Sequence, residues 1–137
     1  MKALAKHKPQ SSLWIMKPKA SSQGKGITVI SNFDEVPRGQ PVVVQQYIAD
    51  PLLINGFKFD LRIYVAVTCV NPLRVYVYDE GLARFASEVY DTSDLKNVFS
   101  HLTNYSINKH NHAEGDEDYV INKTNKWSLK TLREYLT

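Results

Sequence analysis

Residues 58–62 read Lys-Phe-Asp-Leu-Arg, and this stretch decides how the fold is interpreted. In a β-strand successive side chains point to opposite faces, so residues two apart share a face. From Phe59 the odd positions stay apolar as far as Cys69, which predicts a strand with one buried face. Lys58, Asp60 and Arg62 would share the other face, about 6.5–7 Å apart along the strand. That spacing suits the groups of one extended polyanion such as a nucleoside triphosphate, although a solvated sheet face also carries charges with no function.

The composition is that of a globular domain. The chain has 137 residues, of which 43% are hydrophobic and 23% charged. Its net charge of +3 is small for a dedicated nucleic-acid binder, so we expect no nucleic-acid partner. Cys69 is the only cysteine, which rules out an intrachain disulfide, and we expect it in the core. No apolar run suits a signal peptide or a membrane span, which predicts a cytoplasmic protein without a membrane partner.

The remaining pattern predicts an α+β fold of antiparallel sheets with flanking helices. The expected strands are 13–16, 27–30, 42–48 (buried), 58–69, 73–78 and 82–87, the last three forming a meander with turns at 71–72 and 79–81. The expected helices are 93–100 and 128–136, with a polar turn at 101–105 and an acidic loop at 111–118. Asp50-Pro51 would break the chain at a domain junction. The predicted organisation is a frayed end at 1–12, one unit at 13–48 and a second at 49–137.

Three features before this junction suit a nucleotide. Gly24, Lys25 and Gly26 form a flexible hairpin tip, where glycines expose amide donors to phosphate oxygens and the lysine adds a charge; an ordinary surface turn is the commoner explanation. Lys17, at the end of the first strand, is a second candidate for binding phosphate. The alternative is an ordinary surface lysine. Gln46-Tyr47-Ile48 ends an apolar strand where a base could lodge between two units, or is simply a strand end.

Two features after the junction carry further polar groups. Arg84 could converge with Arg62 on one anion, because the guanidinium fork suits carboxylate and phosphate oxygens. Thr103 and Asn104 could orient an acceptor or cap a turn. His110 and His112 lack partners at ligand spacing, so we expect no metal site.

Six ordered blocks together resemble the tubulin tyrosine ligase-like family of ATP-grasp enzymes, most closely its polyglutamylase branch. The resemblance runs from about Leu13 to His110, with a weaker tail around Trp127. The blocks are 14–18 (WIMKP), 21–27 (SSQGKGI), 46–48 (QYI), 58–65 (KFDLRIYV), 81–86 (GLARFA) and 101–109 (HLTNYSINK).

The resemblance implies an ATP-dependent ligase that joins free glutamate to glutamate side chains in acidic tubulin tails through an acyl-phosphate. The residues that would hold ATP are Lys17, Gly24, Lys25, Gly26, Gln46, Tyr47, Ile48, Lys58, Asp60 and Thr103. The residues that would act on the reacting groups are Arg62, Arg84 and Asn104. The location implied is the cytoplasm and cytoskeleton, with the cilium or flagellar basal body as a more specific site.

The sequence also departs from the family pattern. The family holds Mg²⁺ with a later acidic segment that contains a Glu-x-Asn motif, and no Glu-x-Asn occurs here. Because of this, and because the chain stops at Thr137 within a helical pattern, we expect a fragment. Two alternatives stay open: a truncated or inactive member that binds nucleotide or tubulin without ligation, and a binder of RNA or other polyanions that uses basic and tyrosine side chains on a sheet.

Overall fold

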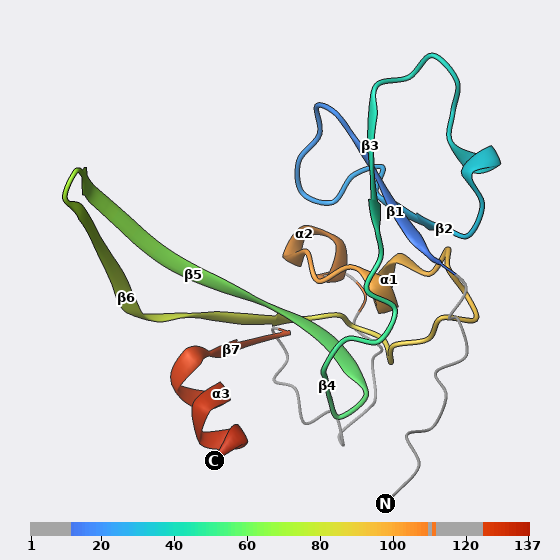
Figure 1. Ribbon diagram of the computed structural model, residues 1–137. Helices are drawn as coiled ribbons and strands as arrows, with labels where there is room; N and C mark the ends of the chain where they lie inside the picture. The colour runs from blue at the N-terminus through green and yellow to red at the C-terminus, as the bar shows by residue number, and fades with distance from the viewer. Residues whose placement is uncertain (1–11, 110, 112–124) are drawn as a thin grey trace, which may run out of the picture.

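The structure is a computed structural model that describes residues 12–109, 111 and 125–137. Residues 1–11 of the expected frayed end at 1–12, and residues 112–118 of the expected acidic loop at 111–118, lie outside these residues. The described part contains a 3-stranded sheet in the order β2-β1-β3 and a 4-stranded sheet in the order β4-β5-β6-β7 (Figure 1). Strand pairing is antiparallel in both sheets. The predicted α+β class with antiparallel sheets and flanking helices is confirmed.

The first sheet contains the predicted hairpin. Its strands are β1 (Trp14–Pro18), β2 (Thr28–Ile30) and β3 (Val42–Gln46), and the 3-10 helix η1 (Phe33–Glu35) lies between β2 and β3. A small core of Leu13, Val29 and Tyr47 packs beside it. The predicted burial of strand 42–48 is wrong over most of its length: Val43 is 47% exposed, and within this segment Tyr47 is the buried residue.

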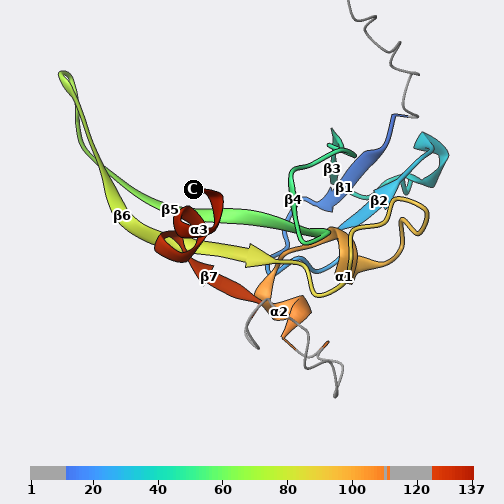
Figure 2. The same cartoon turned by 90° about the horizontal axis from the view of Figure 1, so that it is seen from below.

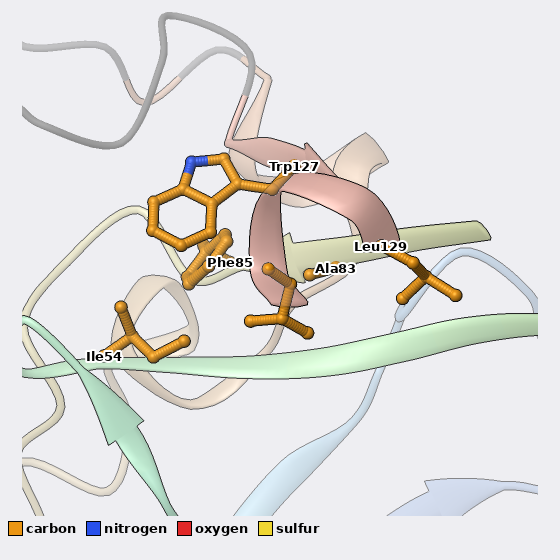
Figure 3. Close-up of a cluster of buried hydrophobic side chains, with 6 residues drawn as sticks. Ile54, Ala83, Phe85, Trp127 and Leu129 are labelled. Atoms are coloured by element: carbon orange, nitrogen blue, oxygen red, sulfur yellow. The ribbon is translucent and has the colours of Figure 1, made fainter. Parts of the chain in front are cut away.

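The second sheet has its core at one end of a long hairpin. Its strands are β4 (Leu53–Ile54), β5 (Phe57–Val70), β6 (Leu73–Phe85) and β7 (Lys126–Ser128). The sequence did not indicate β4 or β7. Ile54, Ala83, Phe85, Trp127 and Leu129 meet in one buried cluster, which Leu132 completes (Figure 3). Helix α3 (Leu129–Leu136) supplies both leucines and covers one face of the sheet there.

The outer part of the β5–β6 hairpin projects away from the rest of the described chain (Figures 1 and 2). The predicted burial of the odd-numbered row holds in part for Phe59, which is partly buried against the core cluster, but is wrong farther along. Leu61, Ile63, Val65 and Val67 are 46–57% exposed. Cys69, expected in the core, is only half-buried. The alternation of side chains is present, but no described element covers the outer part of the strand.

The predicted turn at 79–81 is also wrong, because β6 runs through it. Ile63 pairs with Gly81 and Val65 with Val77, so three residues of β6 lie opposite Tyr64 alone. This is a local bulge in a continuous strand. A Cβ at Gly81 would lie 2.3 Å from the Arg62 carbonyl oxygen, so glycine is needed there for close backbone approach rather than for chain reversal. The meander is therefore a two-stranded hairpin, with its turn at the predicted 71–72.

The helices are shorter than predicted. α1 (Val98–His101) covers only the end of the predicted 93–100, and α2 (Tyr105–Asn108) begins within the expected polar turn. α3 confirms the predicted C-terminal helix, and Ser128 caps its first turn by accepting from the Thr131 amide. In the described ranges, no helix is both long enough and apolar enough to span a membrane.

Candidate functional site

The register of the second sheet places the predicted charged residues on one face. Asp60 lies directly opposite Arg84, and Arg62 opposite Leu82. Directly paired residues share a face, as do residues two apart on a strand. Lys58, Asp60, Arg62 and Arg84 therefore share the face opposite the Phe85 cluster, which confirms the predicted grouping of 58, 60 and 62. Lys126 of β7 pairs with Arg84 and joins the same face.

Asp60 and Arg84 form an ion pair. The Arg84 Nε donates to Asp60 Oδ1 at 2.8 Å, and a terminal guanidinium nitrogen donates to Oδ2 of the same carboxylate. The hydrogen bond to Asp60 raises the pKa of Arg84, against an opposing effect of burial. Sequence reasoning placed Arg84 with Arg62 on a shared anion and Asp60 near a ribose. The structure instead joins Arg84 directly to Asp60, so this carboxylate partly neutralises the cation that was expected to bind an anion.

Lys58 is held at the junction of the two sheets. Its ammonium donates to the His101 carbonyl at 2.7 Å and lies 5.3 Å from the centre of the Tyr47 ring. Burial lowers the pKa of Lys58; the Asp60 charge raises it, and the Lys17 charge lowers it further. A partly desolvated lysine with a lowered pKa is a typical feature of a functional site.

Lys17 lies near the end of β1, with its ammonium donating to Gln45 Oε1 of β3 at 2.7 Å. Lys17 pairs across the strands with Val43, two residues from Gln45, so both side chains lie on one face of the first sheet. Gln45 was not a predicted site residue. Gln46 and Ile48, the predicted partners of a base, are exposed, and Ile48 is 73% accessible.

The glycine tip packs on the segment that carries Asn104. A Cβ at Gly24 would lie 2.5 Å from Ile107 Cδ1 and 2.9 Å from Asn104 Oδ1. Ser106 Oγ donates to the Gln23 carbonyl at 2.8 Å. The tip, expected to be flexible, is therefore docked on residues 104–107. Gly24 is buried by this contact, whereas Lys25 and Gly26 stay exposed.

A buried asparagine fixes the loop that carries Thr103 and Asn104. Asn108 Nδ2 donates to the carbonyls of Leu102 and Asn104, at 2.8 and 2.9 Å. Its Oδ1 accepts from the amide and the hydroxyl of Ser87, at 3.0 and 2.6 Å. These bonds tie the loop to the segment that follows β6, and a fully satisfied buried polar group favours one defined conformation. Thr103 is 9% exposed and Asn104 half-buried.

The structure thus joins Asp60 with Arg84 and Gly24 with Asn104, whereas the Lys17 ammonium contacts Gln45. Arg62 lies on the same face but is exposed. Sequence reasoning missed His101, Asn108, Gln45 and Lys126, although the first two stand inside a block that it quoted. The alternation in Lys126-Trp127-Ser128 was the available signal for Lys126, whose ammonium lies 3.4 Å from the Tyr105 ring centre.

Within 12–109, 111 and 125–137, no group of three histidine, cysteine, aspartate or glutamate side chains is arranged to hold a metal ion. The acidic side chain on the charged face, Asp60, is already paired with Arg84. The donor set on this face is basic, which suits phosphate and carboxylate groups rather than a divalent cation.

Comparison with known proteins identifies the family. The whole chain, residues 1–137, matches the tubulin-tyrosine ligase family. It is 49% identical over 127 residues to mouse tubulin monoglutamylase TTLL4, 46% identical over 127 residues to human tubulin polyglutamylase TTLL5, and 52% identical over 128 residues to human tubulin polyglutamylase TTLL13. Each match covers 90% of this chain but only 10–15% of the relative. The resemblance read from the six sequence blocks is confirmed: the chain belongs to the tubulin-tyrosine ligase family.

Proposed function

We propose that residues 1–137 form part of the ATP site of a tubulin glutamate ligase. The observation that carries the proposal is the charged face, where Lys58, Asp60, Arg62 and Arg84 lie together. Relatives of similar sequence are named tubulin monoglutamylase and polyglutamylase. A basic, partly desolvated face supplies what phosphoryl transfer requires of a protein, namely positioning and charge stabilisation.

The proposed reaction has two steps. A glutamate carboxylate of the tubulin tail attacks the γ-phosphorus of ATP, so an acyl-phosphate forms as the bond to ADP breaks. The amino group of free glutamate then attacks the acyl carbon, loses a proton and displaces inorganic phosphate, which leaves an isopeptide bond. Both steps gather anionic oxygens, so fixed cations stabilise the transition states.

The structure supports a distinct role for each cation. Lys17 and Lys58 suit phosphate oxygens, since both are lysines held by neutral oxygen acceptors that an anion can replace. Arg62 is exposed on the same face and suits the incoming carboxylate or the acyl-phosphate. Asp60 would accept a ribose hydroxyl while it holds Arg84. Gly24, Lys25 and Gly26 would cover the phosphates beside Asn104 and Thr103, with Gln46, Tyr47 and Ile48 along the base.

Magnesium is expected to accompany ATP in the complete enzyme, where it neutralises phosphate charge. The described residues do not fit this ion, because they contain no suitable cluster of carboxylates. We therefore assign no step of the reaction to a metal held by this chain. Any ligands for this ion would come from outside the described residues. We also propose that the chain is divided into two structural units, 13–48 and 49–137. The proposed location is the cytoplasm and cytoskeleton and, more specifically, the cilium or basal body.

ATP binding by the purified chain is the first test. A fluorescent ATP analogue should bind and be displaced by unlabelled ATP. Asp60→Asn should weaken ATP binding while leaving the affinity for a tubulin-tail peptide nearly unchanged. A folded chain that binds no nucleotide would contradict the proposal, and equal weakening of both ligands would point to local unfolding instead.

Ligation needs a chimera in which the chain replaces the matching 127 residues of mouse TTLL4. The chimera should attach radiolabelled glutamate to microtubules, and Arg62→Ala should abolish most of that rate. Loss of one charge-assisted hydrogen bond corresponds to about 1.5–3 kcal/mol, whereas an exposed substitution changes stability by about 0.5 kcal/mol or less. A variant that melts much earlier yet keeps its rate when folded would contradict the proposed role of Arg62.

A second candidate function is binding of nucleotide or tubulin without ligation by the 137-residue chain itself. The absence of a carboxylate cluster from the described residues favours it. The chain alone should then show no turnover with glutamate, microtubules and Mg-ATP. Turnover by the chain alone, abolished by Lys17→Ala, would contradict this second function.

A further inference from the structure

His101 is a buried polar side chain that the proposed function has not used. It is 1% exposed and ends α1, just before the loop that carries Thr103 and Asn104. Its ring stands edge-on to Tyr47 and to Tyr90, with ring centres 5.7 and 5.5 Å away. Tyr47 follows the last strand of the first sheet, whereas α1 contacts β5 of the second sheet. His101 therefore lies where the two sheets meet.

The hydrogen bonds of the ring define its tautomer. His101 Nε2 lies 3.1 Å from the Asp94 carbonyl oxygen, which can only accept, so Nε2 carries the proton. In the neutral ring Nδ1 is then an acceptor, and the Tyr47 hydroxyl, 3.0 Å away, donates to it. Burial lowers the pKa of His101, which favours this neutral form, and burial raises the pKa of Tyr47, which keeps its hydroxyl protonated.

The backbone of the same residue holds the lysine of the charged face. The His101 carbonyl accepts from the Lys58 ammonium at 2.7 Å, and that ammonium also lies over the Tyr47 ring. One residue thus contacts the strand end assigned to the base through its ring and the cation assigned to the phosphates through its carbonyl. A displacement of His101 would change the distance between these two parts of the site.

We propose that His101 is a positioning residue that sets the base-binding segment at Gln46–Ile48 and the phosphate-binding Lys58 in register with each other. The inference rests on the proposed function and adds to it a residue that does not touch the nucleotide. Disturbing His101 should affect ligands selectively, because the distance between the base-binding and phosphate-binding parts matters only to a ligand that spans both. ATP spans both, whereas inorganic triphosphate reaches only the phosphate part.

The test compares ATP with inorganic triphosphate on the 137-residue chain. Tyr47→Phe removes the hydroxyl that bonds the His101 ring, and with it the hydrogen bond between Tyr47 and Tyr90, and leaves the aromatic packing in place. It should weaken ATP binding about 2- to 10-fold, the range for one net hydrogen bond, and leave triphosphate binding unchanged. Tyr135→Phe is the matched control: it deletes a tyrosine hydroxyl that donates to Asn55 Oδ1 at 3.1 Å, away from His101, and should change neither affinity.

Substitutions of His101 itself sharpen the result. His101→Ala should weaken ATP binding at least as much as Tyr47→Phe, and adding Tyr47→Phe should weaken it no further. His101→Asn, which places an acceptor near the position of Nδ1, should recover part of the loss. If His101→Ala fails to fold, His101→Asn together with Tyr47→Phe still decides the question, because His101→Asn leaves Tyr47, itself assigned to the base, unchanged. A ¹⁵N spectrum of the histidine ring should show the neutral form with the proton on Nε2 at pH 7.

The outcomes separate this inference from the proposed function. If the folded wild-type chain binds neither ATP nor triphosphate, the proposed function fails. If the wild type binds both ligands but Tyr47→Phe leaves ATP affinity unchanged, or weakens both ligands equally, the positioning role of His101 is overturned. A ring protonated on Nδ1 at pH 7 would overturn it as well.

Discussion

The inner and outer parts of the β5–β6 hairpin have the same alternating sequence pattern but different surroundings. At the inner end Ala83 and Phe85 are 0% exposed beneath Trp127 and α3. In the outer part Val65, Val77 and Tyr78 are 54%, 59% and 65% exposed. Both parts pair in antiparallel register. Alternation therefore specifies which side chains share a face. Whether that face is buried depends on another element packing against it, which the local sequence does not encode.

The charged residues also differ between the inner and outer parts of the hairpin. At the inner end Lys58, Asp60 and Arg84 each have a hydrogen-bond partner. These bonds are possible because α1 and the paired strands bring acceptors and donors to the face. A two-stranded ribbon without packing is marginally stable in water. The inner end is accordingly where stability and the candidate site coincide.

The largest effect is expected from Phe85→Ala, which tests whether stability is concentrated at the inner end. Truncation of a buried phenylalanine costs about 3–5 kcal/mol, enough to abolish the cooperative transition of a marginal chain. Val65→Ala on the outer hairpin should cost less than about 1 kcal/mol. Urea denaturation followed by circular dichroism measures both, and equal losses would show that the outer hairpin is buried as well.

Gly81→Ala tests the close approach where the two parts of the hairpin meet. The new Cβ would lie 2.3 Å from the Arg62 carbonyl oxygen and 2.9 Å from Leu129 Cδ1. Overpacking of this kind costs about 1–3 kcal/mol. Gly39→Ala is the control, since no atom lies within 4 Å of its added Cβ and only its backbone φ of +78° opposes the change. A larger loss of stability at Gly39 would contradict the packing interpretation.

Sequence reasoning was right about residues that share a face and wrong about what covers them. The alternation from Phe59 to Cys69 predicted a strand, and β5 confirms it. It could not show that α3 covers only the inner end. Asp79-Glu80-Gly81 has the composition of a turn, but in the structure Gly81 allows a bulge within β6. Sequence reasoning therefore did not predict how the residues after Gly81 pair with β5. Register also identifies the partner of a charge, which is why the sequence revealed Asp60 and Arg84 as candidates but not as a pair.

A double-mutant cycle on Asp60 and Arg84 tests whether the inner charges are coupled. Asp60→Asn, Arg84→Gln and the double variant should give a coupling free energy of about 0.5–1 kcal/mol, because solvent screens a pair whose side chains are 39% and 19% exposed. High salt should reduce it. Arg74→Gln, on the outer hairpin opposite Cys69, should leave stability almost unchanged. Zero coupling at low salt would show that the pair contributes nothing to folding.

The smallest effect is a change in the pH dependence of stability caused by His101. Burial lowers its pKa below the usual 6.5, and the Lys58 charge acts in the same direction, while the Asp94 carbonyl and the carboxylates of Asp94 and Asp91 act against it. As the pH falls below 6.5 the unfolded chain binds a proton that the folded ring does not, so the free energy of unfolding decreases toward the folded pKa.

His101→Asn should remove this component of the slope, which cannot exceed about 1.4 kcal/mol per pH unit for one proton. Urea denaturation of the wild type and the variant between pH 7.5 and 5 measures it. His7, His110 and His112 occur in both proteins and cancel in the difference, and the lowered pKa of Asp91 acts below 3.8, outside this range. The outer hairpin, residues 61–79, contains no histidine. The amide hydrogen-exchange rates of this hairpin should therefore be the same in the wild type and in His101→Asn. Parallel stability curves would mean that the pKa of His101 is the same in the folded and unfolded chains, which would contradict the lowering by burial.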